Sequence, residues 1–239
     1  PQAYNDHRPV QRRRKAEVTS LEASHLVIVT GETPKPPGWK NYSMYRMRQH
    51  FDCSSYASDQ TKAFPTMEEY QYFRDSYKKN VNEHAIFEDS PPPTLGYNHD
   101  NSGGPPPYYP GHTKDGKGRG LFASRDIKKG DLIHDGTNND NKFPQDGIAY
   151  KRFVFDLPQK NACDMLHWCW TQRLEENGKL ELLCTFNISS LMNSSHSKAN
   201  IAPQSSTSQK FYAIRDINKG EEILYDYNIY ETDWEDVGL

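Results

Sequence analysis

Two tyrosines near the end of the chain, Tyr225 and Tyr227, are side chains suited to hold a polar reacting group in place. They stand two residues apart in the segment LYDY, so on an extended chain both side chains lie on the same face. Tyrosine hydroxyls donate and accept hydrogen bonds and stay uncharged near neutral pH. The pair therefore suits a reaction in which catalysis is mainly positioning. Two rings that only pack in a β-rich core are the alternative, and the pair taken alone favours it.

A glycine-rich segment, Gly118-Arg119-Gly120, is the second candidate. Glycine allows the backbone to approach a ligand closely, although a plain glycine turn has the same pattern. A polar loop over residues 186–200, FNISSLMNSSHSKAN, lies between this segment and the two tyrosines in the sequence. A ligand site requires the fold to bring these separate groups together.

A repeated motif indicates how the fold is built around these residues. ASRDIKKGD at 123–131 returns as AIRDINKGE at 213–221, with Gly130 and Gly220 at matching places. A tight turn between strands often needs glycine at such a place. The copies therefore predict one strand-to-strand corner used twice. The candidate residues flank the corners, so we expect the corners to be scaffold and the function to lie beside them.

Apolar spacing and breaker residues predict the other elements. Thr66 and Glu69 form a capping-box pattern ahead of an aromatic stripe, which predicts a helix over residues 66–80. Residues 162–174 have helical spacing, and Asn177-Gly178 is expected to end that helix. We expect short strands before and after the second corner and also at 25–30, 120–123, 132–135, 151–157 and 179–186. Short strands, glycine corners and few short helices indicate a mainly β fold of several small sheets.

The composition indicates one real core with a polar periphery. Of 239 residues 34% are hydrophobic, the mean hydropathy is −0.96 and the net charge is −3. The acidic balance argues against direct nucleic-acid binding, and no apolar run is long enough to span a membrane. We expect a disordered basic tail at 1–24, an α/β or irregular extension at 25–89, a proline- and glycine-rich connector at 90–111 and the main domain at 112–239. The QRRRK run in the tail leaves nuclear localisation or contact with a polyanion as alternatives.

The cysteines argue against a metal site. The sequence holds Cys53, Cys163, Cys169 and Cys184 without a Cys-x-x-Cys pair, so the strongest zinc signature is absent. His167 stands between two of them, but Cys163 shares its helical face while Cys169 points elsewhere. We therefore expect no metal, buried structural cysteines and a packed histidine.

Four sequence blocks occur in an order that resembles the SET domain, the fold of S-adenosylmethionine-dependent protein-lysine methyltransferases. They are GKGRGLFASRDIKKGDLI, HDG at 134–136, the loop at 186–200 and GEEILYDY at 220–227. Each block alone is a weak signal, but four in order over residues 112–236 favour the fold strongly. The resemblance implies several small sheets and a C-terminal pseudoknot, in which the last segment passes beneath the loop around 187–200. It leaves residues 1–111 unexplained.

The resemblance also assigns roles to residues of this chain. It makes Tyr227 the catalytic tyrosine and Tyr225 the residue that limits how many methyl groups the amine accepts, which implies monomethylation. It places His134 in the substrate channel, where the family usually has tyrosine, and Ser194 where it usually has histidine. The tail lacks the family's cysteine-rich zinc module, so Trp234 is expected to cover the adenine, with Tyr230 as second candidate. The implied S-adenosyl-L-methionine contacts are Lys117, Gly118, Arg119, Gly120, Asn193, Ser194, Tyr227 and Trp234.

We therefore predict a protein-lysine N-methyltransferase acting on a histone or another protein or peptide. The reacting lysine must be neutral although its free pKa is about 10.4, so the site must favour the uncharged amine. The altered channel and a loop one residue longer than the family pattern leave an alternative, a catalytically degenerate SET domain that serves as a protein-binding module. We expect a monomer without membrane contact. Its expected compartment is nuclear or cytoplasmic, with secretion left open by Asn-x-Ser sequons at Asn41, Asn187 and Asn193.

Overall fold

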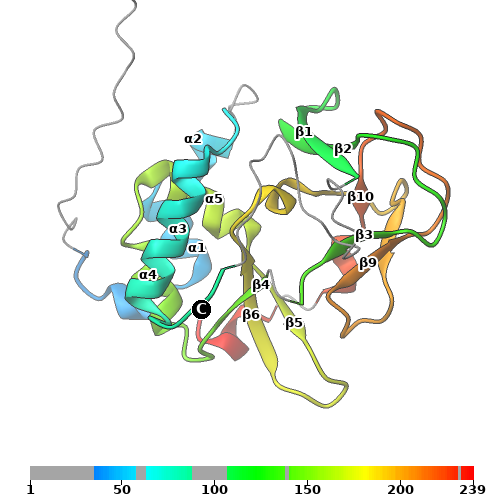
Figure 1. The fold of residues 1–239 in the computed structure, drawn as a ribbon. Coiled ribbons are helices and arrows are strands. Elements are labelled where there is room, and N and C mark those ends of the chain that lie inside the picture. The colour runs from blue at the N-terminus through cyan, green and yellow to red at the C-terminus, as the bar shows by residue number, and fades with distance from the viewer. Residues whose placement is uncertain (1–34, 58–62, 88–106, 138–139, 231–232) are drawn as a thin grey trace, which may run out of the picture. The chain divides into compact units, whose positions relative to one another are not determined.

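The structure, a computed structural model, describes all residues except 1–34, 58–62, 88–106, 138–139 and 231–232 (Figure 1). Contacts divide the chain into two units, Pro1–Glu32 and Thr33–Leu239, and the account below concerns the second. The strand predicted at 25–30, the QRRRK run and most of the connector lie outside the described residues. None of the helices in the described part is long and apolar enough to cross a membrane.

In the described domain short strands in several small sheets outnumber the helices, which confirms the mainly β fold. The helices of the described part are α1 (Met44–His50), α2 (Cys53–Ala57), α3 (Met67–Asn80), α4 (Ile148–Val154) and α5 (Gln159–Trp168), with 3-10 turns η1 (Trp39–Asn41), η2 (Ile188–Leu191), η3 (Tyr227–Ile229) and η4 (Trp234–Val237). The strands are β1 (Tyr108–His112), β2 (Arg119–Ala123), β3 (Leu132–Asp135), β4 (Asp140–Phe143), β5 (Trp170–Arg173), β6 (Leu180–Thr185), β7 (Asn193–Ser194), β8 (Ile201–Pro203), β9 (Lys210–Ala213) and β10 (Leu224–Tyr225). The strands predicted at 120–123, 132–135 and 179–186 are therefore confirmed as β2, β3 and β6.

Sheet pairing brings the separate sequence blocks together. The described strands pair as β1-β2, β3-β9-β8, β4-β6-β5 and a parallel pair of β10 with β7. In that last pair, Leu224 lies opposite Asn193 and Tyr225 opposite Ser194. Asn200, at the far end of the loop, donates its backbone N–H to the Leu224 carbonyl at 2.8 Å. The closing block thus contacts the middle of the loop and its far end, and the passage of the last segment beneath the loop stays a prediction.

The two copies of the repeated corner pack against each other. The backbone N–H of Ile127 donates to the carbonyl of Ile217 at 2.9 Å, and the reverse bond measures 3.0 Å. Asp126 accepts from the backbone N–H of Lys219, and Asp216 accepts from the backbone N–H of Lys129, both at 2.9 Å. Both corner glycines have positive φ, as a tight turn of this kind requires. The repeat is therefore a reciprocal scaffold that fixes the strands beside it.

Helix α3 begins with the predicted capping box. The Thr66 hydroxyl accepts from the backbone N–H of Glu69 at 3.2 Å, and the Glu69 carboxylate accepts from the backbone N–H of Thr66 at 2.9 Å. The aromatic stripe behind the cap, which includes Phe73 and Tyr77, is buried. The sequence therefore predicted both the start of this helix and its buried face.

The Thr66 cap provides a stability test. Thr66→Ala removes the acceptor for one N–H of the first helical turn, so we expect the free energy of unfolding to fall by about 1 kcal/mol. Thr66→Ser keeps a capping hydroxyl and should stay close to wild type. Urea unfolding of the two variants checks this, and equal midpoints would argue against the cap.

Two predicted elements are wrong. Residues 151–157, predicted as a strand, lie mostly in helix α4, because seven residues of apolar alternation do not separate a strand from a buried helix. The helix predicted at 162–174 ends at Trp168, and Trp170–Arg173 form β5. Asn177-Gly178 lies in the hairpin between β5 and β6, where it ends no helix. The described extension is helical, and the end of the predicted connector forms β1.

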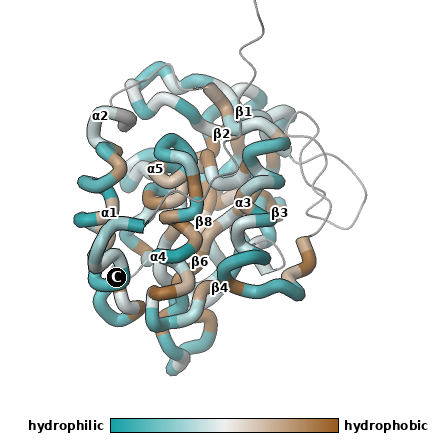
Figure 2. Tube along the Cα trace, turned by 90° about the vertical axis from the view of Figure 1, so that its left-hand side faces the viewer, coloured by the Kyte–Doolittle hydropathy of each residue, from teal (hydrophilic) through white to brown (hydrophobic). Residues whose placement is uncertain are grey.

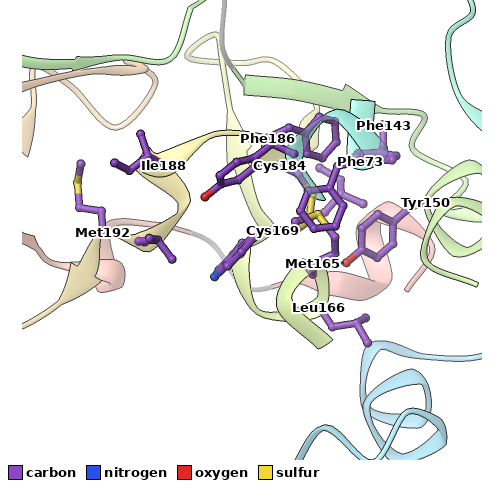
Figure 3. Packing of buried hydrophobic residues seen from close by; sticks show 14 of the residues in the cluster. Phe73, Phe143, Tyr150, Met165, Leu166, Cys169, Cys184, Phe186, Ile188 and Met192 are labelled. Carbon is purple, nitrogen blue, oxygen red and sulfur yellow. Dashed lines mark hydrogen bonds between the residues drawn. A yellow bond between two sulfur atoms is a disulfide. The ribbon is translucent and has the colours of Figure 1, made fainter. Parts of the chain in front are cut away.

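The core lies between the helices and the β4-β6-β5 sheet. Figure 2 shows hydrophobic stretches of the trace near α5, β6 and β8. Phe73 of α3, Phe143 of β4, Tyr150 of α4 and Phe186 after β6 are at most 2% exposed and lie close together in Figure 3. Helices from before and after the connector thus share one core with the strands.

Two disulfide bonds pair all four cysteines, each of which lies in the described part of the chain. Cys53 at the start of α2 bonds to Cys163 on α5, and Cys169 bonds to Cys184 on β6 (Figure 3). The first bond ties the N-terminal extension to the main domain across 110 residues. The expectation of buried structural cysteines is confirmed for Cys163, Cys169 and Cys184, and the structure adds that the cysteines are joined in pairs.

Candidate functional site

Two neighbouring cavities share one wall, and Tyr227 is part of it. The larger has a volume of about 860 Å³ and the smaller about 300 Å³. The larger is lined by residues of the Gly118 segment and of the loop at 186–200, and the smaller by Tyr225 and His134. The residues that line both are Arg48, His167, Trp168, Ser190, Met192 and Tyr227.

Tyr227 begins η3 and is held at both its backbone and its hydroxyl. Its hydroxyl donates to the Met192 carbonyl at 2.7 Å, and its backbone N–H donates to the Ser194 hydroxyl at 3.1 Å. Although 42% of the residue is exposed, burial around the ring raises the pKa of Tyr227 to about 12, against a hydrogen bond from Tyr225 that lowers it. The hydroxyl therefore stays protonated at neutral pH.

Tyr225 lies beside Tyr227 at the smaller cavity. The ring centroids are 4.7 Å apart, and the Tyr225 ring also contacts Phe211 and Tyr230. Burial, followed by the neighbouring Tyr227 and Tyr230, raises the pKa of Tyr225 well above its usual value. The expectation that both tyrosines face one side is confirmed, although the extended segment is short and Tyr227 already belongs to a 3-10 turn.

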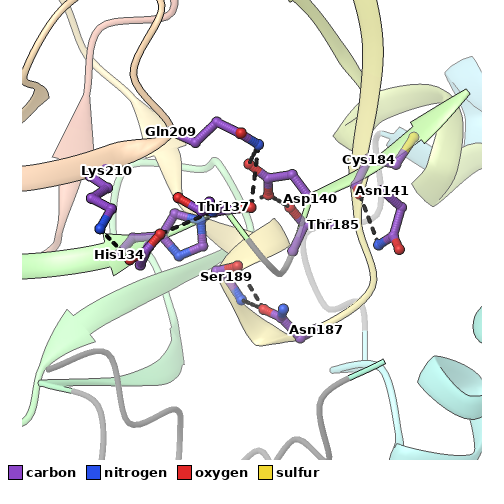
Figure 4. A network of polar contacts seen from close by, with 12 residues as sticks. His134, Thr137, Asp140, Asn141, Cys184, Thr185, Asn187, Ser189, Gln209 and Lys210 are labelled. Carbon is purple, nitrogen blue, oxygen red and sulfur yellow. Dashed lines mark hydrogen bonds and ion pairs between the residues drawn. The ribbon is translucent and has the colours of Figure 1, made fainter. Parts of the chain in front are cut away.

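His134 on β3 lines the smaller cavity and faces a residue that the sequence did not single out, while its place in a substrate channel stays a prediction. Its Nε2 lies 3.9 Å from Oδ1 of Asp140, the first residue of β4 (Figure 4). The Asp140 side chain is only 2% exposed and also lines this cavity. Thr185 donates its hydroxyl to Asp140 at 2.7 Å, and the Gln209 amide donates to it at 3.0 Å.

The Gly118 segment lines the larger cavity only in part. Lys117, Gly118 and Arg119 lie in its wall, whereas Gly120 does not. A Cβ at Gly120 would come within 2.9 Å of the Asn193 amide nitrogen, so glycine permits that contact. Arg119 points into an ion pair with Asp164 at 2.7 Å and is buried.

Asn193 joins the glycine segment to the closing block. Its amide donates to the Arg119 carbonyl at 2.7 Å and to the Glu222 carboxylate at 2.9 Å. Both Asn193 and Ser194 line the larger cavity, as expected for cofactor contacts. The fold therefore brings together groups that stand about seventy residues or more apart in the sequence.

The larger cavity suits S-adenosylmethionine in size and in its donor groups. Its volume lies within the range of small-molecule sites. Gly118 has a φ of 87°, a conformation that exposes backbone groups without side-chain obstruction. Arg48 places positive charge on the wall, which suits a carboxylate such as that of a methionine end, whereas the Lys117 ammonium is paired with Asp115 at 3.0 Å. The residues that would hold the cofactor are Lys117, Gly118, Arg119, Asn193, Ser194 and Tyr227.

Trp234 lines the smaller cavity and not the larger one. It begins η4 and lines the cavity of Tyr225 together with Tyr230. The tail is fixed there because Val237 is fully buried and the Gly238 carbonyl accepts from the Lys151 ammonium at 2.6 Å. Trp234 is therefore part of the wall of the smaller cavity, and its predicted contact with adenine stays a prediction.

The N-terminal helices supply site residues that the sequence did not indicate. Tyr45, Arg48 and Gln49 of α1, with Cys53 and Ser54 of α2, line the larger cavity. Arg48 is fixed by donating to the Leu166 carbonyl of α5 at 2.6 Å. These residues of α1 and α2 precede the Gly118 segment by more than sixty residues and belong to no sequence motif. The Cys53–Cys163 pairing would have been the one signal, and spacing alone could not reveal it.

The disulfides leave the cysteines unable to act as thiolate ligands. No group of three or more histidine, cysteine, aspartate or glutamate residues in the described ranges is arranged to hold a metal. His167, expected to be packed, is exposed and lines both cavities, which corrects that expectation.

Comparison with known proteins agrees with the four sequence blocks. Residues 118–228 match the family model of the SET domain, and no protein of curated function matches the chain. The Polycomb Repressive Complex 2 of Chaetomium thermophilum is 22% identical at a TM-score of 0.34, covering 49% of this chain and 15% of that one. The same complex bound to S-adenosylmethionine in an autoinhibited conformation is 23% identical at a TM-score of 0.35, covering 49% of this chain and 14% of that one.

A Plasmodium falciparum protein described as a histone methyltransferase is 22% identical at a TM-score of 0.31, covering 51% of this chain and 93% of that one. The chain spans 14–15% of the length of the Chaetomium chains. Likeness at these scores does not say how the chain works, so the assignment depends on the family model. That match begins at Gly118 and ends one residue beyond Tyr227, so it includes both copies of the corner and both blocks beside them: residues 118–228 of this chain are a SET domain.

Proposed function

We propose that this chain is a protein-lysine N-methyltransferase that uses S-adenosylmethionine and adds one methyl group to a lysine. The observation that carries the proposal is the position of Tyr227, which lines both the larger and the smaller cavity. A reaction between two ligands needs a cofactor site and a substrate site that meet at the reacting atoms. The SET family supplies the reaction class, and the chain supplies this geometry.

The residues divide the work between the two cavities. The cofactor, when bound, supplies a methyl group on a positively charged sulfur. The backbone at Lys117 and Gly118, with Asn193 and Ser194, would hold it in the larger cavity. Tyr227 orients the lysine nitrogen through its uncharged hydroxyl. The aromatic walls of the smaller cavity limit the water around the amine and so favour its neutral form.

Incubation with labelled S-adenosylmethionine, a histone panel and cell-lysate proteins tests the proposal. We expect label on lysine side chains. Cofactor binding in calorimetry without any transfer would favour the protein-binding module instead. If neither cofactor binding nor methyl transfer is observed, the result would count against S-adenosylmethionine as the cofactor and against the proposed reaction.

Tyr225 provides a test of monomethylation. Tyr225→Phe removes a hydroxyl from the smaller cavity and leaves room for a methylated amine to turn, so we expect di- and trimethyllysine in addition to monomethyllysine. Mass spectrometry of a peptide product checks the ratio over time. A product distribution equal to wild type would contradict the role of Tyr225, even if transfer itself is retained.

The substrate is proposed to be a protein or peptide lysine, histone or other, bound by a monomeric enzyme. The nuclear or cytoplasmic compartment stays a prediction. The two disulfides favour the open alternative, an oxidising compartment such as the secretory pathway, because cytosolic and nuclear proteins keep their thiols reduced.

A further inference from the structure

Asp140 is a buried carboxylate in the wall of the smaller cavity. Its side chain is 2% exposed, and a Cβ at Gly136 would collide with it, so the HDG block leaves room for this carboxylate. A carboxylate removed from water requires a compensating charge or several hydrogen bonds. Its partners therefore decide what else it binds.

The partners of Asp140 do not neutralise it. Thr185 and Gln209 are neutral donors, at 2.7 and 3.0 Å (Figure 4). No Lys or Arg nitrogen in the described part of the chain lies within 4.0 Å of it, and the His134 Nε2 at 3.9 Å is beyond hydrogen-bond length. A carboxylate has about four acceptor sites, so it retains capacity for a further donor.

The surroundings of Asp140 suit a cation with an aliphatic chain. Burial is the largest cause of the raised pKa of Tyr230, and the charge of Asp140 is the second largest. The same charge makes a smaller contribution to the raised pKa of Tyr225. Its field therefore reaches two rings of the cavity wall. Trp170 and Tyr230 lie with their ring centroids 6.0 Å apart on the same wall. Aromatic faces and a carboxylate attract the same ligand, an ammonium group.

We propose that Asp140 binds the ammonium group of the substrate's lysine as it enters the smaller cavity, and so selects for a cationic end group. This inference rests on the proposed function, because it names the residue that recognises that substrate. Lysine in a peptide arrives protonated at neutral pH. Asp140 therefore stabilises the arriving form. The ammonium releases its proton to bulk water before methyl transfer, and Tyr227 positions the neutral nitrogen.

Binding of two small probes tests Asp140 without any turnover. n-Butylammonium matches the lysine side chain, and n-butanol is its neutral counterpart. By NMR titration at pH 7 we expect wild type to prefer the ammonium about 10- to 100-fold. Asp140→Asn keeps an acceptor for Thr185 but removes the charge, so the preference should disappear.

Asp135→Asn is the matched control. It removes the same charge from β3, where Asp135 pairs with the Lys210 ammonium at 3.0 Å and lines neither cavity. The preference should persist in this variant. Equal binding of the two probes by wild type would overturn the proposal. A preference that survives Asp140→Asn would also overturn it.

The kinetics add a readout that a purely structural role would not move. Asp140→Asn should raise the KM for a lysine peptide about tenfold or more, while the acid limb of the kcat profile shifts to lower pH. The sign follows because a nearby carboxylate raises the pKa of the bound amine, and its removal yields neutral amine at lower pH.

The other titratable groups around this cavity are Arg48, His134, His167, Tyr225, Tyr227 and Tyr230, and none of them is substituted in the variant. An unshifted profile would contradict the proposal, and loss of all transfer in wild type would instead count against the proposed function.

Discussion

Replacing Tyr227 by phenylalanine is expected to lower kcat about 100- to 1,000-fold, the usual cost of removing one well-placed hydrogen-bonding group from an active site. Tyr227 lines both cavities, and its hydroxyl is fixed by the Met192 carbonyl at 2.7 Å. The ring remains in the variant, so the shape of the shared wall should persist. Initial rates with labelled cofactor and saturating peptide measure the effect.

Tyr212→Phe is the control for Tyr227→Phe. Tyr212 lies on β9 opposite Leu132 and lines neither cavity, so loss of its hydroxyl should leave kcat close to wild type. Tyr227→Phe frees the Met192 carbonyl, which should cost only about 1 kcal/mol of stability, and thermal unfolding can verify that the variant is folded. A Tyr227→Phe enzyme with wild-type kcat would contradict the assignment of the catalytic residue and of the reaction.

The sequence predicted those parts of the molecule that depend on local patterns. The capping box of α3, the two glycine corners and strands β2, β3 and β6 are each determined by neighbouring residues. The positions of Tyr225, His134 and Asn193 at the cavities came from the order of motifs. What local pattern could not show was that the corners pack on each other, because that pairing spans 90 residues.

The incorrect predictions involve tertiary contacts. Residues 151–157 alternate like a strand but pack as α4 against α3, and the end of the predicted helix at 162–174 is drawn into β5 by pairing with β6. Asp140 belongs to no sequence motif. Its burial depends on Thr185 and Gln209, which are distant in the sequence, and on the space at Gly136, so no local pattern identifies it. Long-range packing decided each of these, and a single sequence does not record it.

Loss of the Cys53–Cys163 disulfide is expected to lower the free energy of unfolding by about 4–5 kcal/mol. The bond closes a loop across 110 residues, and a longer loop restricts the unfolded chain more strongly. The double variant Cys53→Ser, Cys163→Ser avoids a free thiol, and guanidinium unfolding measures the change. A loss of this size is a large part of the 5–15 kcal/mol typical of a folded protein.

The Cys169–Cys184 bond provides the internal comparison. It spans 15 residues, so its removal should cost about 3 kcal/mol, and the two loops do not overlap in the chain. Only the Cys53–Cys163 variant should also weaken S-adenosylmethionine binding, because both of those cysteines line the larger cavity. A five-residue helix such as α2 has little stability of its own and depends on this bond to remain in the cavity wall. Four free thiols in the denatured wild-type protein would show that the cysteines are not paired, and the argument for an oxidising compartment would then fail. Variants as stable as wild type would contradict the expected stabilisation.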